Sequence, residues 1–354
     1  MSYQTKYEQK IALQYETMPW IEKYRPDTFQ GVISHNNIVD TLKNFITNKN
    51  IPHLLFYGPP GTGKTSIINV CAKELYGEQY NLMVLEINAS EERGIEIVRT
   101  RISQFVTTKN VFCADPNMFK LVILDEADAM TADAQAMLRR VIEKYTKNTR
   151  FCLICNYIKK INVALQSRCT KFRFSPLNDK HIRIKTKEII KCENINVTPD
   201  GLDAIIQRAG GDMRKVLNVL QATSMAYSEI TEENVNKCIG YPSSSDAYII
   251  FNSLLYDSFQ ESHTVIEKFI SQKGYSLIDI LNEIYHKLVD KVIYSAEYTE
   301  NMNIPLKILE LLADLEYNVS SCTSETLQIS AIIGIFKLVI STVCKGKQIC
   351  HNVA

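Results

Sequence analysis

The 354-residue sequence lacks an excess of charge of either sign, because 40 Lys and Arg residues balance 39 Asp and Glu residues and leave a formal net charge of +1. This balance excludes a generally basic protein that coats nucleic acid, so any contact with DNA or RNA must come from a local basic patch. The sequence also lacks a repeat of fixed period and a low-complexity tract. At this length we expect two or three domains.

Long hydrophobic runs are also missing. The N-terminal "MSYQTKYEQKIALQYETM" has no apolar core of signal-peptide length and mixes charges of both signs. The longest apolar stretch, 329–340 ("ISAIIGIFKLVI"), is too short to cross a bilayer and contains Lys337, so it predicts a buried helix. We therefore expect a soluble intracellular protein that has no membrane partner.

The ten cysteines are scattered, which is typical of small buried hydrophobic residues in a reducing compartment. The only C-x-x-C pair is Cys152 and Cys155, in "RFCLICNY". If this segment is a strand, residues three apart point to opposite faces of the sheet. The two thiolates then cannot share one zinc ion, and core cysteines are the better interpretation.

Short apolar runs alternate with helical patterns from about residue 20 to about residue 176. Helical patterns follow at 64–77, 94–105 and 134–145, and Gly77 is a plausible C-terminal stop for the first of them. Strands alternating with helices predict a parallel sheet that is covered on both faces. The expected strands are 53–57, 82–87, 119–128, 149–156 and 170–174.

The composition changes after this region. Short helical patterns between 177 and 241 predict a small bundle, in which Thr198 is an N-cap and Pro199 is the first helical residue. The Pro/Ser-rich stretch 241–248 ("YPSSSDAY") indicates a domain boundary. Beyond it the pattern is helical throughout, and a helix that is apolar all round must be enclosed by other helices or by another subunit. Apolar residues recur there at helical spacing, as in Leu277, Leu281, Ile284 and Leu288.

The segment "GPPGTGKT" (58–65) matches G-x-x-x-x-G-K-[ST] between an expected strand and an expected helix. Glycines allow positive φ angles and close approach of the backbone to a phosphate, and backbone N–H groups at a helix N-terminus face the anion. Lys64 would place its charge at the β- and γ-phosphates, and the Thr65 hydroxyl could bind Mg²⁺. The predicted nucleotide-binding residues of this segment are Gly58, Pro59, Pro60, Gly61, Thr62, Gly63, Lys64, Thr65 and Ser66.

Four polar residues are predicted to complete the site. Asp125 ends an apolar strand, at the edge where ligands bind open α/β sheets, and would complete the Mg²⁺ shell. Glu126 would polarise the attacking water, and Asn156 at the end of the next strand would orient it by a hydrogen bond. Arg214, at the start of a helix in "GGDMRK", could reach the γ-phosphate and couple the nucleotide state to the position of the small bundle. Alternatives are a solvated acidic loop, a turn-forming Asn and a solvated Arg.

The order of the motifs carries a resemblance to a known family. "PWIEKYRP" (19–26) precedes "IPHLLFYGPPGTGKT", and "LEINASEERGIEIVR", "LDEAD", "FCLICNY", "SRC" and "GDMRK" follow in register. Over roughly residues 18–240 they resemble the AAA+ ATPases and, within these, the small subunits of replication factor C, the eukaryotic sliding-clamp loader. "DEAD" also names a helicase family, but the further helicase motifs are not found in the sequence.

This resemblance implies a RecA-like, parallel-sheet ATPase domain at 19–176 and a helical lid domain at 177–241. It also implies a helical collar for oligomerisation at 242–354, after an N-terminal extension at 1–18. The implied cofactors are ATP and Mg²⁺. The implied partners are the other subunits of a heteropentamer, a sliding clamp and primer–template DNA, in the nucleus, for DNA replication and repair.

The resemblance also assigns residues. Arg168, in "SRC", is expected to act as an arginine finger in the ATP site of the adjacent subunit, where a guanidinium stabilises the charge of γ-phosphoryl transfer; capping of its own sheet edge is the alternative. The "W-x-x-K-Y-R-P" segment is expected near the adenine base. The adenine-recognition candidates are Tyr24, Arg25, Pro26 and Val32.

Contacts with DNA and clamp are implied in the same way. Arg93 and Arg99 match the family's phosphate-gripping arginines near a helix N-terminus, and contacts to phosphates carry no sequence information. A solvated helix face is the alternative. The segment 101–108 ("RISQFVTT") is the expected clamp contact.

Three features depart from the family pattern. "ASEER" replaces the usual "ASDDR", the segment 110–120 is longer than usual, and the first 18 residues extend past the common start. The alternative functions are another DNA-processing motor, such as a Holliday-junction motor or an initiation factor, a small-molecule kinase, or a mainly structural clamp-loader subunit.

Overall fold

The computed structural model describes residues 18–91, 96, 98–108, 118–294, 303–319 and 324–351. The chain divides into two compact units, Met1–Ile230 and Thr231–Ala354. The predicted N-terminal extension, apart from Met18, lies outside the described residues. The predicted domain boundary near residue 241 lies eleven residues after the observed division at Ile230. One helix, α13 (Glu232–Ile239), lies between the two positions in the chain.

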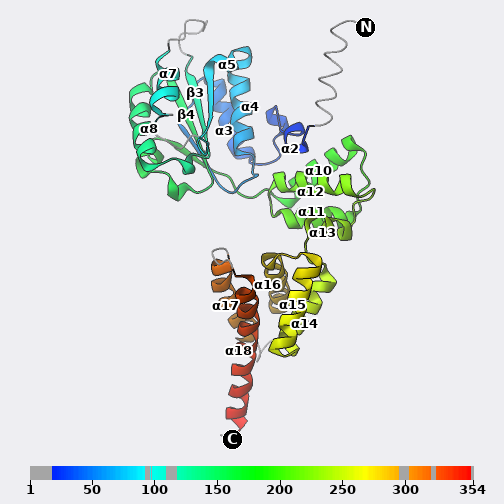
Figure 1. Ribbon diagram of the computed structural model, residues 1–354. Helices are drawn as coiled ribbons and strands as arrows, with labels where there is room; N and C mark the ends of the chain where they lie inside the picture. The colour runs from blue at the N-terminus through cyan, green and yellow to red at the C-terminus, as the bar shows by residue number, and fades with distance from the viewer. Residues whose placement is uncertain are drawn as a thin grey trace. The chain divides into compact units, whose positions relative to one another are not determined.

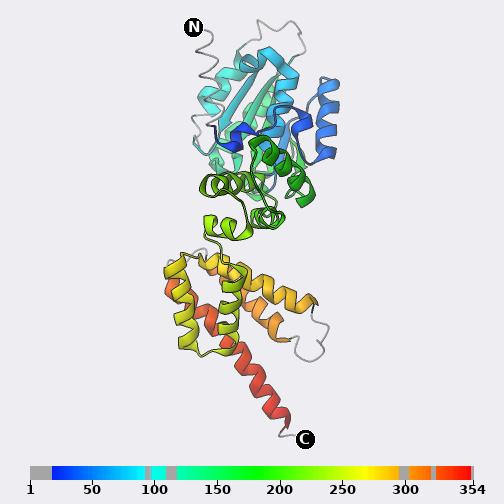
Figure 2. The same cartoon turned by 90° about the vertical axis from the view of Figure 1, so that its right-hand side faces the viewer.

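The first unit is built on a five-stranded sheet in which every pairing is parallel, as the sequence predicts. The strand order is β2-β3-β4-β1-β5, and the strands lie side by side in both views (Figure 1, Figure 2). The second strand starts later than expected, because Leu82 and Met83 belong to the helix α5 (Tyr80–Met83). The strands are β1 (Leu54–Tyr57), β2 (Val84–Asn88), β3 (Lys120–Asp125), β4 (Thr149–Cys155) and β5 (Thr170–Arg173).

Helices cover both faces of this sheet (Figure 1). On one face, α3 (Asn36–Thr47) and α4 (Lys64–Tyr76) contribute Leu42, Ile67 and Ile68 to a core with Phe56 and Ile154. On the other face, the π-helical segment η3 (Val98–Ile102) continues into α7 (Ser103–Thr107), and α8 (Ala132–Tyr145) packs beside them. The remaining short helices of the sheet region are η1 (Phe29–Gly31), η2 (Gly77–Gln79), η4 (Ala127–Ala129), η5 (Ile158–Lys160) and α9 (Val163–Gln166).

The two cysteines of the C-x-x-C pair confirm the strand geometry. Cys152 belongs to the core that contains α4, whereas Cys155 belongs to the core that contains α8. The side chains of the pair therefore point to opposite faces of β4, as the alternation of a strand requires. Burial raises the pKa of the Cys155 thiol to about 12, which keeps it in the neutral form.

A small helical bundle follows the sheet within the first unit. It consists of α10 (Asp179–Glu193), α11 (Pro199–Ala209) and α12 (Met213–Ala226). Each helix begins with an N-cap residue whose side chain accepts a hydrogen bond from a backbone N–H of the first turn. The N-caps are Asn178, Thr198 and Asp212 respectively. The predicted roles of Thr198 and Pro199 are thus confirmed.

The N-terminal helix α2 (Trp20–Lys23) rests on this bundle. The backbone N–H of Trp20 donates to Gln221 on α12 at 3.1 Å, and Lys23 Nζ lies 2.6 Å from Glu193 on α10. Trp20 is only 8% exposed. These contacts join residues at the start of the described chain to helices that lie far away in the sequence.

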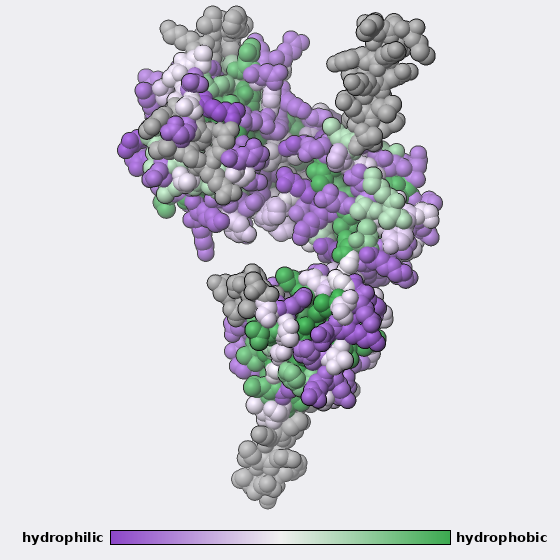
Figure 3. Space-filling view, viewed as in Figure 1, coloured by the Kyte–Doolittle hydropathy of each residue, from purple (hydrophilic) through white to green (hydrophobic). Residues whose placement is uncertain are grey.

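The second unit is entirely helical over its described residues. The core is formed by apolar residues of α14 to α18, including Leu277, Leu281, Ile284 and Leu288 at the predicted helical spacing. After α13, the helices are α14 (Ser244–Tyr256), α15 (Phe259–Lys273), α16 (Leu277–Tyr294), α17 (Asn303–Val319) and α18 (Glu325–His351). Figure 3 shows hydrophobic residues among hydrophilic ones on one face of this unit.

The last helix is longer than the apolar stretch that predicts it. Its window Glu325–Thr342 has the length and composition of a membrane span, a property that helices packed in a protein core share. The same helix buries Ile332, Ile333 and Phe336 completely in the helical core, whereas Leu338 is 59% exposed, so the predicted burial is confirmed for one face of the helix. Lys337 Nζ donates to the carbonyl of Leu254 at 2.9 Å and so satisfies the end of α14.

Candidate nucleotide-binding and hydrolysis site

The phosphate loop connects β1 to α4, and its glycines hold a conformation that other residues adopt only with strain. Gly61 and Gly63 have φ angles of +66° and +90°, and Gly63 is the N-cap of α4. A Cβ at Gly61 would lie 1.6 Å from Oδ1 of Asp212, the N-cap of α12. The backbone N–H of Met213 donates to the Gly61 carbonyl at 3.2 Å. The loop therefore contacts the helical bundle directly.

Lys64 is the first residue of α4 and is 7% exposed. Its Nζ donates to the carbonyl oxygens of Gly58 at 2.9 Å and Pro59 at 2.7 Å, and to Oδ1 of Asn156 at 3.1 Å. Burial lowers the pKa of Lys64, while the nearby Asp125 carboxylate opposes this shift. The ammonium group is thus held at the mouth of the loop by three acceptors.

The predicted Mg²⁺ ligands lie together. Thr65 Oγ1 donates to Oδ2 of Asp125 at 2.7 Å, across the gap between α4 and the end of β3. The other Asp125 oxygen accepts the backbone N–H of Glu126 at 2.8 Å. A hydroxyl and a carboxylate in contact are oxygen ligands suited to Mg²⁺, so these residues fit the ion that the motif predicts.

Glu126 and Asn156 also line the pocket. Glu126 follows β3 with a φ of +51°, a left-handed conformation that is uncommon outside glycine. Asn156 follows β4, which pairs with β3, so the expected proximity of the two strand ends is confirmed. In the structure the side-chain oxygen of Asn156 accepts a hydrogen bond from Lys64. The role of Asn156 in orienting water stays a prediction.

The predicted adenine-recognition residues line one pocket with the phosphate loop. Tyr24, Arg25, Pro26 and Val32 are all part of its wall. The Tyr24 hydroxyl donates to Glu193, which ties the base end of the pocket to α10. The sequence motifs did not indicate an apolar side of the same wall. This side comprises Ile21, Ile33, Leu177, Met213 and Leu217, with Ser34 and Lys185 beside them.

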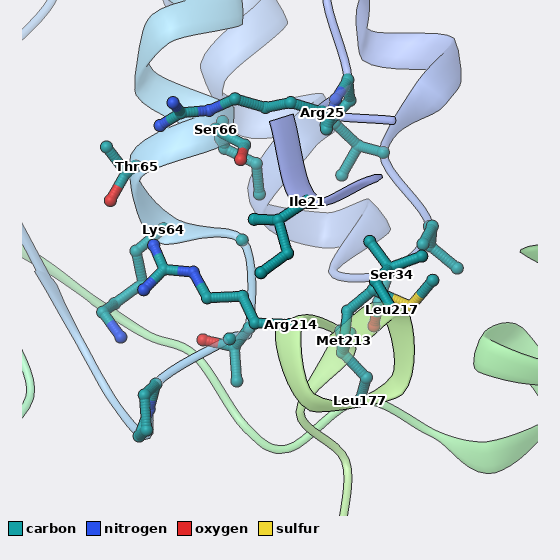
Figure 4. A pocket seen from close by; sticks show the side chains of 18 of the residues that line it. Ile21, Arg25, Ser34, Lys64, Thr65, Ser66, Leu177, Met213, Arg214 and Leu217 are labelled. Carbon is teal, nitrogen blue, oxygen red and sulfur yellow. The ribbon is translucent and has the colours of Figure 1, made fainter. Parts of the chain in front are cut away.

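Figure 4 shows how these side chains are arranged. Ile21, Met213 and Leu217 gather at one side of the pocket, and Lys64 and Arg214 lie at the other. Met213 and Leu217 are one turn apart on α12, so a helical face next to the "GDMRK" motif was the signal that could have found them. The pocket therefore has a polar end suited to phosphates and an apolar end suited to a base.

Arg214 is the second residue of α12, and its side chain is directed toward Lys64 (Figure 4). The charge of Arg214 contributes to the lowered pKa of Lys64, after burial, the first cause. Two cations directed at one pocket form a site for an anion. The predicted contact of Arg214 with a γ-phosphate is consistent with this position.

Arg168 does not line this pocket. Its Nη1 donates to the Ala164 carbonyl at 2.6 Å, and its Nη2 forms an ion pair with Glu143 on α8. The side chain is 33% exposed. Gly58 and Pro59 also lie outside the pocket wall, although their carbonyls hold Lys64.

Two arginines, Arg93 and Arg99, are expected to grip DNA. Arg93 lies outside the described residues. Arg99 belongs to η3, and only its backbone is among the described parts of the chain. In the segment 101–108, Ile102 and Val106 are buried, and Arg101 and Gln104 are exposed. The exposed face of this segment is polar.

Comparisons with known proteins agree with this geometry. Residues 54–177 match the family "ATPase family associated with various cellular activities (AAA)", and residues 242–334 match the "Replication factor C C-terminal domain". A solved structure titled "Thermotoga maritima RuvB Holliday junction branch migration motor" has a TM-score of 0.50 at 14% identity, and the match covers 75% of this chain and 91% of that chain. At this identity the likeness shows the fold alone.

Curated relatives are similar over nearly the whole chain. Human "Replication factor C subunit 5" is 46% identical over 332 residues, which are 94% of this chain and 95% of the relative. "Replication factor C subunit 3" of Schizosaccharomyces pombe is 46% identical over 321 residues, 91% of each chain. The protein of that name from Saccharomyces cerevisiae is 43% identical over 327 residues, 91% of this chain and 94% of the relative. The chain therefore belongs to the replication factor C subunits and is an AAA ATPase.

Proposed function

We propose that this chain hydrolyses ATP as one subunit of a heteropentamer that opens a ring-shaped clamp and loads it onto primer–template DNA, in the nucleus. The observation that carries the proposal is that the chain's predicted catalytic residues do not all lie at one site. Lys64, Thr65, Asp125 and Glu126 line one pocket, whereas Arg168 lies outside it. A cation at the surface, outside its own pocket, is suited to the site of a neighbouring subunit.

Within the pocket, the phosphates of ATP would lie against the N-terminus of α4, with Lys64 at the β- and γ-phosphates. Arg214 would contact the γ-phosphate from α12, so the helical lid would change position with the nucleotide state. The base would lie against the apolar wall next to Tyr24 and Arg25.

Thr65 and Asp125 would hold Mg²⁺, which neutralises charge on the phosphate oxygens when it is bound. The Glu126 carboxylate, at the end of β3, would accept a proton from the attacking water. Asn156, at the end of the neighbouring strand, would orient that water. The in-line attack itself would need an arginine of an adjacent subunit, in the role proposed for Arg168 of this chain, to stabilise the transition state.

Partners would bind on other surfaces. The surface hydrophobic residues of the second unit, which include Tyr248, Tyr256 and Leu327, support packing against the other subunits. We propose phosphate contacts with the DNA backbone for Arg93 and Arg99, and clamp contact for the exposed side of 101–108. The Holliday-junction alternative rests on a likeness in fold alone, whereas relatives at 46% identity favour replication factor C.

The trans assignment is tested with two variants in the complete assembly. Lys64→Ala is expected to abolish nucleotide binding at this chain's own site, because it removes the buried ammonium group. Arg168→Ala is expected to leave nucleotide binding here unchanged and to slow hydrolysis at the adjacent subunit by a factor on the order of 10³. Site-resolved nucleotide binding and assembly ATPase rates would measure both effects.

Two outcomes would contradict the proposal. Rapid ATP turnover by a verified monomer would show that the pocket needs no cation from outside. A loss of hydrolysis confined to this chain's own site in Arg168→Ala would show that the arginine acts in cis. A mass-spectrometric inventory of the chains that co-purify with the protein would identify the other subunits and the clamp.

A further inference from the structure

We infer that Glu143 is a positioning residue for Arg168: it fixes the guanidinium in a prepared geometry and thereby sets the rate of hydrolysis in the adjacent subunit. The inference rests on the proposed trans role of Arg168 and adds a residue that none of the sequence motifs contains. Glu143 lies near the end of α8, and Arg168 follows α9, a helix that packs against α8.

The contacts define one orientation of the guanidinium. Arg168 Nη1 donates to the Ala164 carbonyl of its own preceding helix at 2.6 Å. Arg168 Nη2 forms an ion pair with Oε1 of Glu143. A planar guanidinium that is held at two nitrogen atoms can no longer rotate freely, although it has five N–H donors. Donors that these two contacts do not use remain available for a phosphate of another chain.

The contact lies at the surface, where restraining the Arg168 side chain reduces the number of rotamers that it samples. The Arg168 side chain is 33% exposed, and without a partner it would sample many rotamers. Ordering a long side chain at an interface opposes binding, and a partner that orders it beforehand reduces this cost. Glu143 would therefore favour transition-state contact with the adjacent nucleotide.

The negative charge of Glu143 opposes this benefit unless another group neutralises it. Arg139, one turn earlier on α8, supplies that group, because its Nε donates to the same Oε1 of Glu143 at 3.0 Å. The hydrogen bond from Arg139, together with the charge of Arg168, lowers the pKa of Glu143. The three side chains carry a net charge of +1, so the cation offered to the adjacent subunit is not cancelled.

The test compares Glu143→Gln with the wild-type chain in the complete assembly, with steady-state ATP hydrolysis as the readout. The finger-dependent rate is the difference between the wild-type assembly and the Arg168→Ala assembly. Glu143→Gln is expected to lower the finger-dependent kcat about five-fold without raising KM for ATP, because substrate binding in the adjacent pocket is unaltered. In the Arg168→Ala background, Glu143→Gln is expected to have no effect.

A matched control uses Glu233 of α13, which forms an exposed i,i+4 ion pair with Lys237 as Glu143 does with Arg139. Glu233→Gln is expected to leave kcat unchanged. If Glu143→Gln fails to assemble, Glu143→Asp keeps the charge but shortens the side chain, and it is expected to lower the same kcat.

Each result is decisive. An equal loss in the wild-type and Arg168→Ala backgrounds would assign Glu143 a structural role and overturn the inference. An unchanged or faster rate would also overturn it, because the contact would then be neutral or restraining. If Arg168→Ala itself does not slow the adjacent subunit, the proposed function fails and the inference fails with it. If only Glu143→Gln is without effect, the proposed function stands.

Discussion

Replacing Gly61 by Ala tests the contact between the phosphate loop and the lid. The backbone at this glycine is left-handed, with φ at +66°, and a Cβ would lie 1.6 Å from Asp212 Oδ1. The left-handed conformation costs a non-glycine residue roughly 1–2 kcal/mol. The Asp212 carboxylate must also move, which removes the cap of α12 at a cost of about 1 kcal/mol. We expect Gly61→Ala to destabilise the first unit by about 2–3 kcal/mol.

Gly63 provides a matched control. Its φ is +90°, but a Cβ there would have no neighbour within 4 Å. Gly63→Ala should therefore cost only the backbone strain of roughly 1–2 kcal/mol. The difference between the two variants isolates the contact with Asp212. Chemical denaturation of the full-length chain measures it through the fluorescence of Trp20, the single tryptophan, which is buried and bonded to Gln221 of α12.

A double variant sharpens the interpretation. In the Gly61→Ala background, Asp212→Ala should cost nothing further, because the cap has already been displaced. Equal destabilisation by Gly61→Ala and Gly63→Ala would contradict this prediction, since the contact with Asp212 would then contribute no free energy. Full additivity of Gly61→Ala and Asp212→Ala would refute it as well.

Three further predictions follow from other contacts. Thr65→Val should abolish Mg²⁺-dependent hydrolysis while nucleotide binding without Mg²⁺ persists, because the hydroxyl beside Asp125 is lost; filter binding with and without the ion measures this. Burial, followed by the charge of Arg150, lowers the pKa of His53 from 6.5 to about 4. Between these pH values the unfolded chain binds the proton and the folded chain does not. The free energy of unfolding should therefore be at its full value above pH 6.5 and fall toward pH 4, by up to about 3 kcal/mol. In His53→Gln the denaturation midpoint should fall less over the same pH range. Asp246→Ala should destabilise the helical unit by about 2 kcal/mol, because the Tyr275 hydroxyl loses its acceptor at 2.6 Å; thermal melting followed by circular dichroism tests this.

Much of the site was predictable because its residues form local motifs. The phosphate loop needs glycines, a lysine and a hydroxyl within eight consecutive residues, and the flanking strand and helix have recognisable periodicity. Asp125 and Asn156 were predictable because parallel strands end at one edge of a sheet. Twelve of the fourteen predicted nucleotide-binding residues line one pocket wall, because the folded chain brings these segments together, and the other two, Gly58 and Pro59, contribute the carbonyls that hold Lys64.

The succession of strands and helices, the phosphate loop and the acidic strand end follow from local sequence patterns, because each depends on residues that are close neighbours in the chain. Three contacts of the site depend instead on how the chain packs in space. Asp212 packs on Gly61, the Tyr24 hydroxyl donates a hydrogen bond to Glu193, and Glu143 holds Arg168. These pairs are far apart in the chain, and no periodicity links them. Their contacts arise from the path of the backbone through the packed unit, which local patterns of residue type do not specify.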